Sequence, residues 1–501
     1  MKVIGMDIGT TSISSVVMDT ETGRQLTSRT IPNDTAVPGP VWVRQQDPEL
    51  IWEKCVNLVE EYKRTWPDIA RIGLTGQMHG MLYVDKDGNA ISLLTTWEDE
   101  RGNLPCEHMG ENLSRDAVQE TPLQEAGREN SPSEEKSKNS APENAPSGEK
   151  NENSVPENGK TYAEQLSDLT GYPMATGYGL TTHFYNLLND CAPTNAACIT
   201  TIMDYVGMKL TGATRPVTHT TNAASFGLFD MQKMDFDREA CTRAGIDASL
   251  LPEVLKEESI IGKTDTGIEV VVAIGDNQAG VLGLVQDPDD AVISIGTSSQ
   301  ISVVRTEIIP DTDVECRPFV EGKYLYLGVG LCGGTSFAML NRFFCETCGM
   351  FSSGAEKDAM FGMMMQAAEK EYAREAVSEE TLKINTQFRG TRLDPTLRGS
   401  ITGITMNNFT PGSLALGFYR GVCTELYETY QKMQLPEGKG RLLLCGNALR
   451  NNPLLRKICE DVFGRKSYLS EQKEEAAIGA AKLAEKTGDG SLSCDSLIKR
   501  Q

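Results

Sequence analysis

Three shortages narrow the function of this 501-residue chain. Positive charge is scarce: 48 Lys and Arg face 70 Asp and Glu, a net charge of −22, so nucleic-acid binding through a basic patch is not expected. No apolar run approaches the length of about 18 residues that a membrane span needs, and the N-terminus lacks the layout of a signal peptide. Histidine occurs only 4 times, and Cys345 and Cys348 form a single CxxC pair, which argues against a zinc site and favours reduced thiols on a helix.

Two common nucleotide-binding signatures are incomplete. Residues 262–264, Gly-Lys-Thr, resemble the end of a P-loop, but Glu257 stands where the first glycine is required. Gly328, Gly330 and Gly333 fit G-x-G-x-x-G between a strand and a helix. A long polar segment, rather than a returning strand, follows that helix, so the dinucleotide-binding unit does not close. Close strand–helix packing or contact with an adenine base explains these glycines better.

Length and cysteine content indicate a multidomain protein of a reducing compartment. A chain of 501 residues with 39% hydrophobic content is too long for one ordinary core, so two or more domains are expected. The 13 cysteines are odd in number and scattered, which is typical of reduced thiols in the cytoplasm and not of a disulfide framework.

The sequence is organised around residues 270–304. A strand at 270–274 runs into Gly-Asp-Asn-Gln at 275–278, and a small-residue helix follows at 279–285. Strands are then predicted at 291–295 and 301–304, joined by the turn Gly296-Thr297-Ser298-Ser299, because short β-branched runs bounded by Gly and Asp favour strands. An acid that ends a strand beside a glycine, here Asp276, is expected to point into a cleft. The turn offers the N–H groups and hydroxyls that phosphate oxygens need.

A similar turn occurs near the N-terminus. Strands at 2–6 and 13–18 flank Asp7-Ile8-Gly9-Thr10-Thr11-Ser12. Either turn alone is as compatible with an ordinary hairpin, but the pair, each with a nearby acid, indicates one device used twice. We therefore predict two related domains that face each other across a nucleotide cleft, with a boundary near Leu251-Pro252.

Residues 107–160 differ from the rest of the chain. Between 111 and 160 there are eleven acids and six bases and few large apolar side chains. Such a segment cannot bury enough apolar surface to offset the entropy of ordering. We interpret 125–158 as a disordered acidic insertion in the first domain; a regulatory interaction segment is the alternative.

Two further residues are candidates for ligand contact. His79 follows a strand end in Gly76-Gln77-Met78-His79-Gly80, and either contacts a ligand or is a satisfied structural histidine. Trp97, near Asp99 and Arg101, resembles a sugar platform, since an indole face stacks on C–H edges while a carboxylate accepts from hydroxyls. The alternative is a half-buried tryptophan beside a surface salt bridge.

Together these motifs resemble the FGGY carbohydrate kinases over nearly the whole chain except the insertion. The resemblance implies an α/β fold of two actin-like (ribonuclease H-like) domains around an ATP and sugar cleft. Residues 1–252 would carry the sugar site and the first phosphate loop, and residues 253–501 the catalytic Asp and the nucleotide site. The residues 444–448, Leu-Cys-Gly-Asn-Ala, occupy the adenosine motif but lack its usual second glycine.

The resemblance also implies roles for individual residues. Asp276 would be the general base, and Asp7 and Asp276 would hold Mg²⁺. The sugar would be bound by Gln77, Met78, His79, Trp97, Asp99 and Asn277. The nucleotide would be bound by Gly9, Thr10, Thr11, Ser12, Gly296, Thr297, Ser298, Gly333, Gly334, Gly446, Asn447 and Asn451.

The implied reaction is transfer of the γ-phosphoryl group of ATP to a terminal hydroxyl of a neutral ketose. Residues 76–80 are similar to the ketose loop of xylulokinases, whereas 96–101, 177–182, 222–225 and 446–452 are closer to sedoheptulokinases. We therefore expect sedoheptulose to be the substrate. Xylulose or another pentulose or hexulose is the alternative, and a non-catalytic sugar- or nucleotide-responsive module is the rival of another class. The resemblance is compatible with a homodimer and implies neither a nucleic-acid nor a membrane partner.

The insertion gives a first test. Deleting residues 125–158 is expected to leave the melting temperature and the kinase activity nearly unchanged, because the entropy of loop closure varies slowly with loop length. Thermal denaturation and turnover of the deletion variant measure this. A large fall in melting temperature would mean that the segment belongs to an ordered element.

Overall fold

The computed structural model describes residues 1–106, 159–310, 312–351, 357–375, 381–391, 394, 396–434 and 440–487. The predicted insertion at 125–158 lies outside the described residues.

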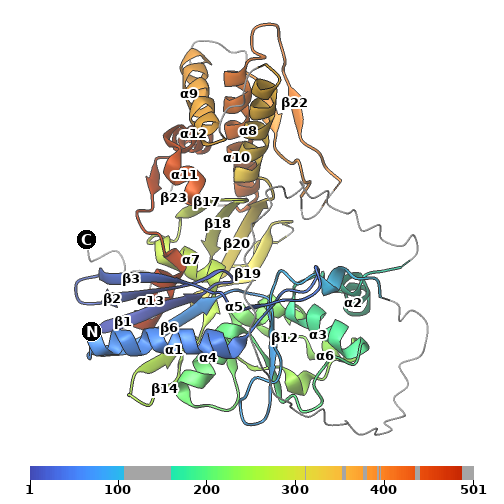
Figure 1. The fold of residues 1–501 in the computed structure, drawn as a ribbon, viewed down its shortest axis with the longest axis vertical. Helices are drawn as coiled ribbons and strands as arrows, with labels where there is room; N and C mark the ends of the chain where they lie inside the picture. The colour runs from blue at the N-terminus through green and yellow to red at the C-terminus, as the bar shows by residue number, and fades with distance from the viewer. Residues whose placement is uncertain are drawn as a thin grey trace, which may run out of the picture.

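Two β-sheets form the centres of two domains (Figure 1). The first sheet has the order β14-β15-β6-β1-β2-β3, with β16 also paired to β6, and the second has the order β19-β20-β18-β17-β23-β24. The first sheet consists of β1 (Lys2–Ile8), β2 (Ser12–Asp19), β3 (Arg24–Pro32), β6 (Ile69–Gly76), β14 (Ile260–Lys263), β15 (Glu269–Val271) and β16 (Ile274–Gly275). The second consists of β17 (Ala291–Ile295), β18 (Ser299–Arg305), β19 (Glu315–Pro318), β20 (Tyr324–Gly330), β23 (Leu442–Cys445) and β24 (Ser467–Leu469).

The two sheets repeat one topology. In the first, β1 pairs antiparallel with β2, β2 antiparallel with β3, and β1 parallel with β6. In the second, β17, β18, β20 and β23 pair in the same senses. The prediction of two related domains, each with a turn between its first two strands, is confirmed.

The helices cover the sheets and occupy the space between them. They are α1 (Pro48–Thr65), α2 (Tyr162–Thr170), α3 (Gly179–Leu188), α4 (Ile202–Thr211), α5 (Thr220–Ala223), α6 (Arg238–Arg243), α7 (Asp276–Leu284), α8 (Gly334–Gly349), α9 (Lys357–Glu375), α10 (Pro411–Lys432), α11 (Asn447–Asn451), α12 (Pro453–Phe463) and α13 (Glu475–Lys486). Helix α1 begins as its sequence predicts: Asp47 accepts from the N–H groups of Glu49 and Leu50, and Pro48 takes the first position.

A smaller lobe of the first domain lies beside its sheet. It contains α2, α3 and α6 and short strand pairs packed around their own apolar core.

The remaining strands of both domains are short. They are β4 (Ala36–Val37), β5 (Gln45–Gln46), β7 (Leu82–Val84), β8 (Leu94–Thr95), β9 (Cys198–Thr200), β10 (Val217–His219), β11 (Phe229–Asp230), β12 (Asp235–Phe236), β13 (Glu253–Leu255), β21 (Lys383–Asn385) and β22 (Ser400–Thr402). Residues 219–225 include helix α5, whose first turn is capped by the His219 side chain.

Helices α7 and α13 join the domains. Their apolar side chains share one core with both sheets, including Val3 of β1 and Val292 of β17, and Figure 1 shows both helices between the sheets. Helix α13 is close to its neighbours because small residues line the contact: a Cβ on Gly5 would lie 1.9 Å from the Ala477 carbonyl oxygen, and one on Gly73 1.9 Å from that of Ala480. Lys482 donates to the Gly283 carbonyl at the end of α7 (2.7 Å).

This arrangement corrects the expected domain boundary at 252/253. Strands β14, β15 and β16 follow that point but belong to the first sheet, where β15 and β16 pair parallel with β6. The second sheet begins only at β17. Asp276 therefore stands at the end of a first-domain strand, and the chain crosses to the second domain after α7. The sequence of a short apolar strand does not show which sheet the strand joins. The point where the chain passes from the first domain to the second could therefore not be predicted from the sequence.

Helix α9 is more buried than its sequence predicts. The charged side chains of residues 353–380 favour an exposed helix pair, but the described part is one helix whose Met360, Met364 and Ala368 are buried in the core of the second domain. Their spacing of four residues places them on one face, which packs against α10. The second domain thus carries a layer of α8, α9, α10 and α12 (Figure 1).

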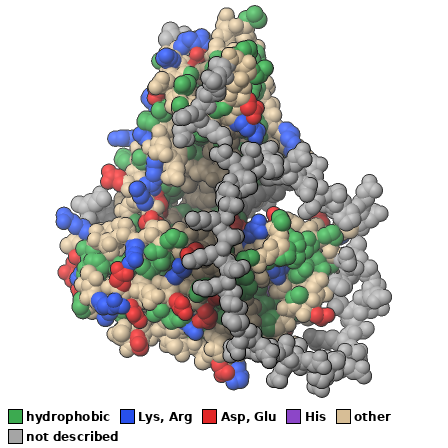
Figure 2. All heavy atoms as spheres, viewed as in Figure 1, with side chains coloured by type: hydrophobic (Ala, Val, Ile, Leu, Met, Phe, Trp, Pro, Cys, Tyr) green, Lys and Arg blue, Asp and Glu red, His purple; other side chains and the backbone are tan. Residues whose placement is uncertain are grey.

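The surface carries mixed charge. On the face in Figure 2, the basic and acidic side chains of the described residues are interspersed over both domains. Among the residues that the structure describes, none of the helices combines the length and apolarity that crossing a bilayer requires.

The close contact of α7 with α13 predicts a sharp contrast between two glycines. A Cβ on Gly479 would lie 1.8 Å from the Ala279 carbonyl oxygen, whereas one on Gly280 of α7 would meet no atom within 4 Å. Gly479→Ala is expected to lower the free energy of unfolding by about 1–3 kcal/mol or more through overpacking. Gly280→Ala should raise it by about 0.5–1 kcal/mol. Urea denaturation measures both, and equal stability of the two variants would contradict the packing described.

Candidate active site

Two carboxylates stand at the ends of strands that flank β6. Thr75 of β6 pairs with Asp7 of β1 on one side and with Ile274 of β16 on the other, two residues before Asp276. Because β1, β6 and β16 run parallel, Asp7 and Asp276 emerge from the same edge of the sheet. The carboxyl edge of parallel strands is where α/β folds bind their ligands.

The environment raises the pKa of both carboxyls. Burial, together with the charges of Asp276 and Glu474, raises the pKa of Asp7 to about 7. Burial raises the pKa of Asp276 to about 6, opposed by the Asn277 backbone N–H and by the charge of Arg317. Within the described residues, Asp7 Oδ1 is buried and meets no hydrogen-bond donor. Two such carboxylates fit a cation, since a bound divalent ion would offset their charge.

The turn between β1 and β2 is held from outside. Gly9 N–H donates to the Ser12 carbonyl (3.0 Å), and Asn33 Nδ2 donates to the Gly9 carbonyl (2.8 Å). Gln46 Nε2 donates to the Thr10 carbonyl (2.7 Å). These bonds fix Thr10 and Thr11 at the open edge of the first sheet, near Asp7.

The turn between β17 and β18 is enclosed by two glycine segments. Gly296 N–H donates to the Ser298 carbonyl (3.0 Å), and Gly334 N–H donates to the Gly296 carbonyl (2.7 Å). A Cβ on Gly333 would lie 2.3 Å from the Ser298 carbonyl oxygen, and one on Gly446, at φ +90°, 2.5 Å from that of Ile295. The start of α8 and the loop before α11 can approach the turn only because these positions lack a side chain. The glycines at 328–333 thus serve close packing.

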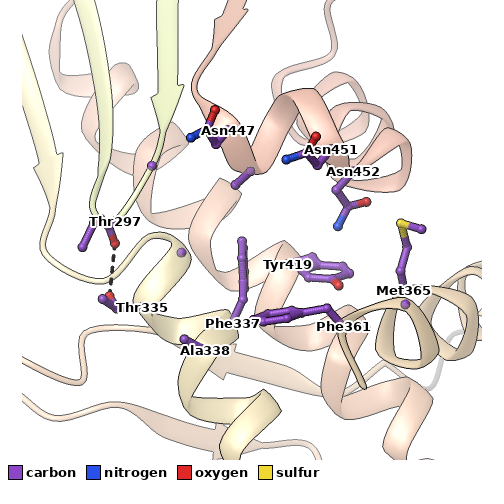
Figure 3. Close-up of a pocket in the computed structure, with 14 residues that line it drawn as sticks. Thr297, Thr335, Phe337, Ala338, Phe361, Met365, Tyr419, Asn447, Asn451 and Asn452 are labelled. Atoms are coloured by element: carbon purple, nitrogen blue, oxygen red, sulfur yellow. Dashed lines mark hydrogen bonds between the residues drawn. The ribbon is translucent and has the colours of Figure 1, made fainter. Parts of the chain in front are cut away.

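A cavity of about 700 Å³ opens beside the second turn. Figure 3 shows Asn447, Asn451 and Asn452 along one wall and Phe337, Phe361 and Tyr419 along the other. The remaining lining residues are Gly296, Thr297, Gly334, Thr335, Ala338, Gly362, Met365 and Ala448. Among the residues that the structure describes, the lining carries no charged side chain, and aromatic faces opposite amides suit a flat heterocycle with polar edges. Of the residues expected to bind nucleotide, Gly296, Thr297, Gly334, Asn447 and Asn451 line this cavity.

A second cavity, of about 210 Å³, lies between the domains. The first domain contributes Met78, His79, Tyr178 and Ser225, among others, and the second contributes Glu315, Cys316 and Arg317. Asn277 Nδ2 lies 3.7 Å from the Met78 sulfur, and a Cβ on Gly275 would lie 2.6 Å from the same sulfur. Met78 therefore forms a wall shared by the cavity and the segment that carries Asp276.

His79 is fixed in an uncommon backbone conformation, at φ +71°. Its N–H donates to Ser225 Oγ (3.1 Å) and its Nδ1 bonds the Ser225 carbonyl (2.7 Å). A carbonyl can only accept, so Nδ1 carries the proton and Nε2 of a neutral ring is an acceptor. The ring stacks on Tyr178, with centroids 4.8 Å apart and planes 3° from parallel. A strained, buttressed histidine lining a cavity favours the ligand interpretation.

The other residues expected to contact sugar have different surroundings. Gln77 is buried: its Oε1 accepts from Thr10 Oγ1 (3.3 Å) and its Nε2 donates to Gln46 Oε1 (2.8 Å). Trp97 is half-exposed and donates from Nε1 to Thr10 Oγ1 (3.0 Å). Both side chains hold the first turn, and neither is part of the lining of the second cavity.

The position of Asp99 contradicts the expectation that this residue contacts the sugar. It is fully buried and accepts from the Arg44 N–H (2.9 Å), the Arg101 N–H (3.1 Å), and Arg101 Nε and Nη2 (2.7 and 3.2 Å). Arg101 Nη1 donates onward to Asn186 Oδ1 (2.6 Å). Each carboxylate oxygen of Asp99 already accepts two bonds, so the residue anchors the loop instead of facing a ligand. The alternative interpretation of this stretch, a salt bridge at the surface, also differs from the structure, because the pair is buried.

Sequence reasoning missed several lining residues. Phe337, Phe361 and Tyr419 were not among the residues expected to bind the nucleotide, and no strand was predicted at β19, which carries Glu315 and Arg317. Tyr178 and Ser225 stood in stretches noted for their family resemblance. Their local sequence carries no signal of a site, because it is the packing of the domains that brings them together.

Comparisons with known proteins agree with this geometry. A model of the FGGY family of carbohydrate kinases, N-terminal domain, matches residues 2–130 and 154–283, and the C-terminal domain model matches 291–486. A Mus musculus sedoheptulokinase is 26% identical over 525 residues, covering 95% of this chain and 96% of that protein. Structures of a xylulose kinase and a gluconate kinase, both from Lactobacillus acidophilus, each match at a TM-score of 0.71 and 18% identity over 100% of this chain and 92% of theirs.

The buried pair of Asp99 and Arg101 predicts a large stability effect. Asp99→Asn removes one charge of a buried pair and should cost about 3–5 kcal/mol of unfolding free energy. Asp87→Asn is the matched control, because Asp87 pairs with Lys86 at the exposed surface and should change stability by less than about 1 kcal/mol. Thermal melting compares the two. A stable Asp99→Asn with a raised sugar KM would restore the ligand role.

Proposed function

The chain belongs to the FGGY family of carbohydrate kinases, and from that premise we propose that it transfers the γ-phosphoryl group of ATP to a terminal hydroxyl of sedoheptulose. The match to a mouse sedoheptulokinase over nearly the full length of both chains supports this substrate. Xylulose is the alternative substrate, supported by the ketose-like segment 76–80 and by the match to a xylulose kinase structure.

The neutral cavity of about 700 Å³ accommodates the adenosine. Gly296 and Thr297 of the second turn line it, so the phosphates would extend along that turn towards Thr10, Thr11 and Ser12. Ser298 and Gly333 would support the backbone of the turn. Backbone N–H groups and hydroxyls of both turns donate to the phosphate oxygens. Gly446 allows the asparagine-bearing helix α11 to approach this path.

The sugar occupies the cavity of about 210 Å³. That volume is below the range of about 300–1,000 Å³ that is typical of drug-sized ligands, so it favours a single sugar unit. His79 Nε2 accepts from a hydroxyl, and Asn277 holds the end of the sugar nearest Asp276. Gln77, Trp97 and Asp99 act indirectly, through the first turn and its neighbouring loop.

The observation that carries the proposal is the position of Asp276. It begins α7 at the carboxyl edge of the first sheet, beside the wall shared with the sugar cavity. With its pKa raised by burial only to about 6, it is largely ionised at neutral pH and can accept the proton of the attacking hydroxyl. Alignment of hydroxyl and phosphate, and exclusion of water, supply the rest of the acceleration.

Mg²⁺ belongs to the proposal because the two carboxylates fit it. Asp7 and Asp276 would hold it, and Asp7 has a buried oxygen with no protein donor among the described residues. When bound, the ion neutralises phosphate charge.

The described cysteines are free thiols, which supports a reducing compartment such as the cytoplasm. A homodimer is proposed on the family resemblance alone.

Asp276→Asn tests the reaction. Asn is nearly isosteric and cannot take the proton, so kcat should fall by about 10²–10⁴-fold or more while ATP and ketose still bind. Sugar-dependent ADP release measures the rate, and thermal melting checks the fold. Asp47→Asn, a change at the N-cap of α1, is the control and should keep full activity. Retention of more than about a tenth of wild-type kcat would remove Asp276 from the mechanism and favour a non-catalytic binding module.

Gly362→Leu tests the nucleotide cavity. A Cβ on Gly362 would meet no atom within 4 Å, and the residue lines that cavity, so the leucine would extend into it. The KM for ATP should rise by roughly tenfold, equivalent to about 1.4 kcal/mol of lost binding, while the ketose KM stays unchanged. Gly349→Leu is the control, because Gly349 also has open space but ends α8 away from the cavity. An unchanged ATP KM would place the nucleotide elsewhere.

A further inference from the structure

The second domain contributes an ion pair to the sugar cavity. Strand β19 is the edge strand of the second sheet, paired with β20, and lies against α5 of the first domain (Figure 1). Its residues Glu315 and Arg317 line the cavity together with first-domain residues. Arg317 Nε and Nη2 lie 2.7 Å and 2.6 Å from Glu315 Oε1. The Arg317 side chain is 13% exposed and that of Glu315 is 31% exposed, so the pair is partly screened from solvent.

Arg317 also stands beside the reacting groups. Its Nη1 lies 3.9 Å from the Met78 sulfur, the atom that Asn277 Nδ2 approaches at 3.7 Å. Next along the chain, the Pro318 carbonyl accepts from Gln278 Nε2 of α7 (3.0 Å). This bond ties the end of β19 to the helix that begins at Asp276, so the position of Arg317 is fixed relative to the general base.

The guanidinium is oriented by its partner. Two of its three nitrogens face Glu315, and the third, Nη1, faces the wall next to Asn277. An arginine without such a partner would present its fork to a carboxylate or a phosphate, which it binds in a bidentate manner. Here Glu315 occupies the fork. Only Nη1 remains directed at the cavity, where it can donate to a neutral oxygen such as a hydroxyl.

The charge around the cavity supports the same conclusion. Arg317 and Glu315 form a pair without net charge in the cavity lining, and Arg317 is close enough to Asp276 to lower the pKa of that carboxyl. An anionic sugar would find no unpaired positive charge in a partly desolvated site, where an uncompensated charge is costly. A neutral polyhydroxy compound would meet no such penalty.

We propose that the Glu315–Arg317 pair is a specificity-determining element: it selects a neutral ketose and rejects aldonic acids and sugar phosphates, because Glu315 occupies the guanidinium fork that an anion would use. The inference rests on the proposed function and deepens it. It also makes the sugar site dependent on both domains, since the pair comes from the second domain and His79 from the first.

The experiment compares sedoheptulose and xylulose with gluconate, a six-carbon anionic sugar acid, by sugar-dependent ADP release at fixed ATP. Glu315→Gln keeps the shape of the side chain and removes its charge, which frees the fork of Arg317. The ratio of kcat/KM for gluconate to that for the better ketose should rise at least tenfold, with the ATP KM unchanged. Glu307→Gln, at an exposed position of the same domain, is the matched control and should leave the ratio unchanged.

A second pair of variants gives the opposite prediction. Arg317→Gln should lower kcat/KM for the ketose at least tenfold, mainly through KM, without a gain for gluconate. The double variant Glu315→Gln/Arg317→Gln should lose whatever gluconate activity Glu315→Gln gained, because the gain requires the guanidinium. If the pair had only a structural role, these variants would lower the activities with ketose and gluconate together, and the ratio of the two kcat/KM values would stay constant.

The outcomes separate the two proposals. Wild-type enzyme that turns over a ketose, combined with a ratio that shifts less than twofold in Glu315→Gln, overturns the specificity inference and leaves the kinase assignment intact. Wild-type preference for gluconate over both ketoses overturns it as well. Absence of turnover with every sugar of the panel rejects the ketose kinase function and, with it, this inference.

Discussion

The close contact of α7 and α13 between the two sheets is the constraint on which the other features depend. Helix α13 comes from the end of the described chain, yet it crosses β1 and β6 near the positions of Gly5 and Gly73 and meets α7 at Gly479. A side chain at any of these glycines would occupy the position of a backbone carbonyl. The contact therefore fixes the distance between the domains by direct backbone packing, because a close-packed interior has low compressibility.

The distance between the domains sets the geometry of the groups that line the cleft. Asp276 begins α7, so the helix that joins the domains also carries the candidate base, and Gln278 in the same first turn donates to the Pro318 carbonyl at the end of β19. Helix α7 thus fixes the positions of the candidate base, the wall of the sugar cavity and the second-domain ion pair relative to one another. Both Asp7 and Asp276 have pKa values raised by burial, an electrostatic cost that is typical of residues kept for chemistry.

Much of the candidate site could be predicted from short stretches of sequence. The turns at 9–12 and 296–299 were predicted together with their flanking strands, and the structure gives both hairpins the same pairing. Met78 and His79 were expected to bind sugar and do line the smaller cavity. Gln77 and Asp99 were expected beside them but lie in buried networks, because a polar side chain near a strand end can turn inward when partners from distant segments satisfy it.

The sequence by itself determined the hairpins, the acids that end β1 and β16, and the capped start of α1, since each depends on residues that are near one another in the chain. Only the tertiary structure decided that residues 260–275 belong to the first sheet, that Asp99 pairs with Arg101 in the interior, and that Glu315 and Arg317 reach the sugar cavity. These depend on contacts between segments as far as 239 residues apart in the chain. No local pattern encodes such contacts, because they follow from how whole strands and helices pack.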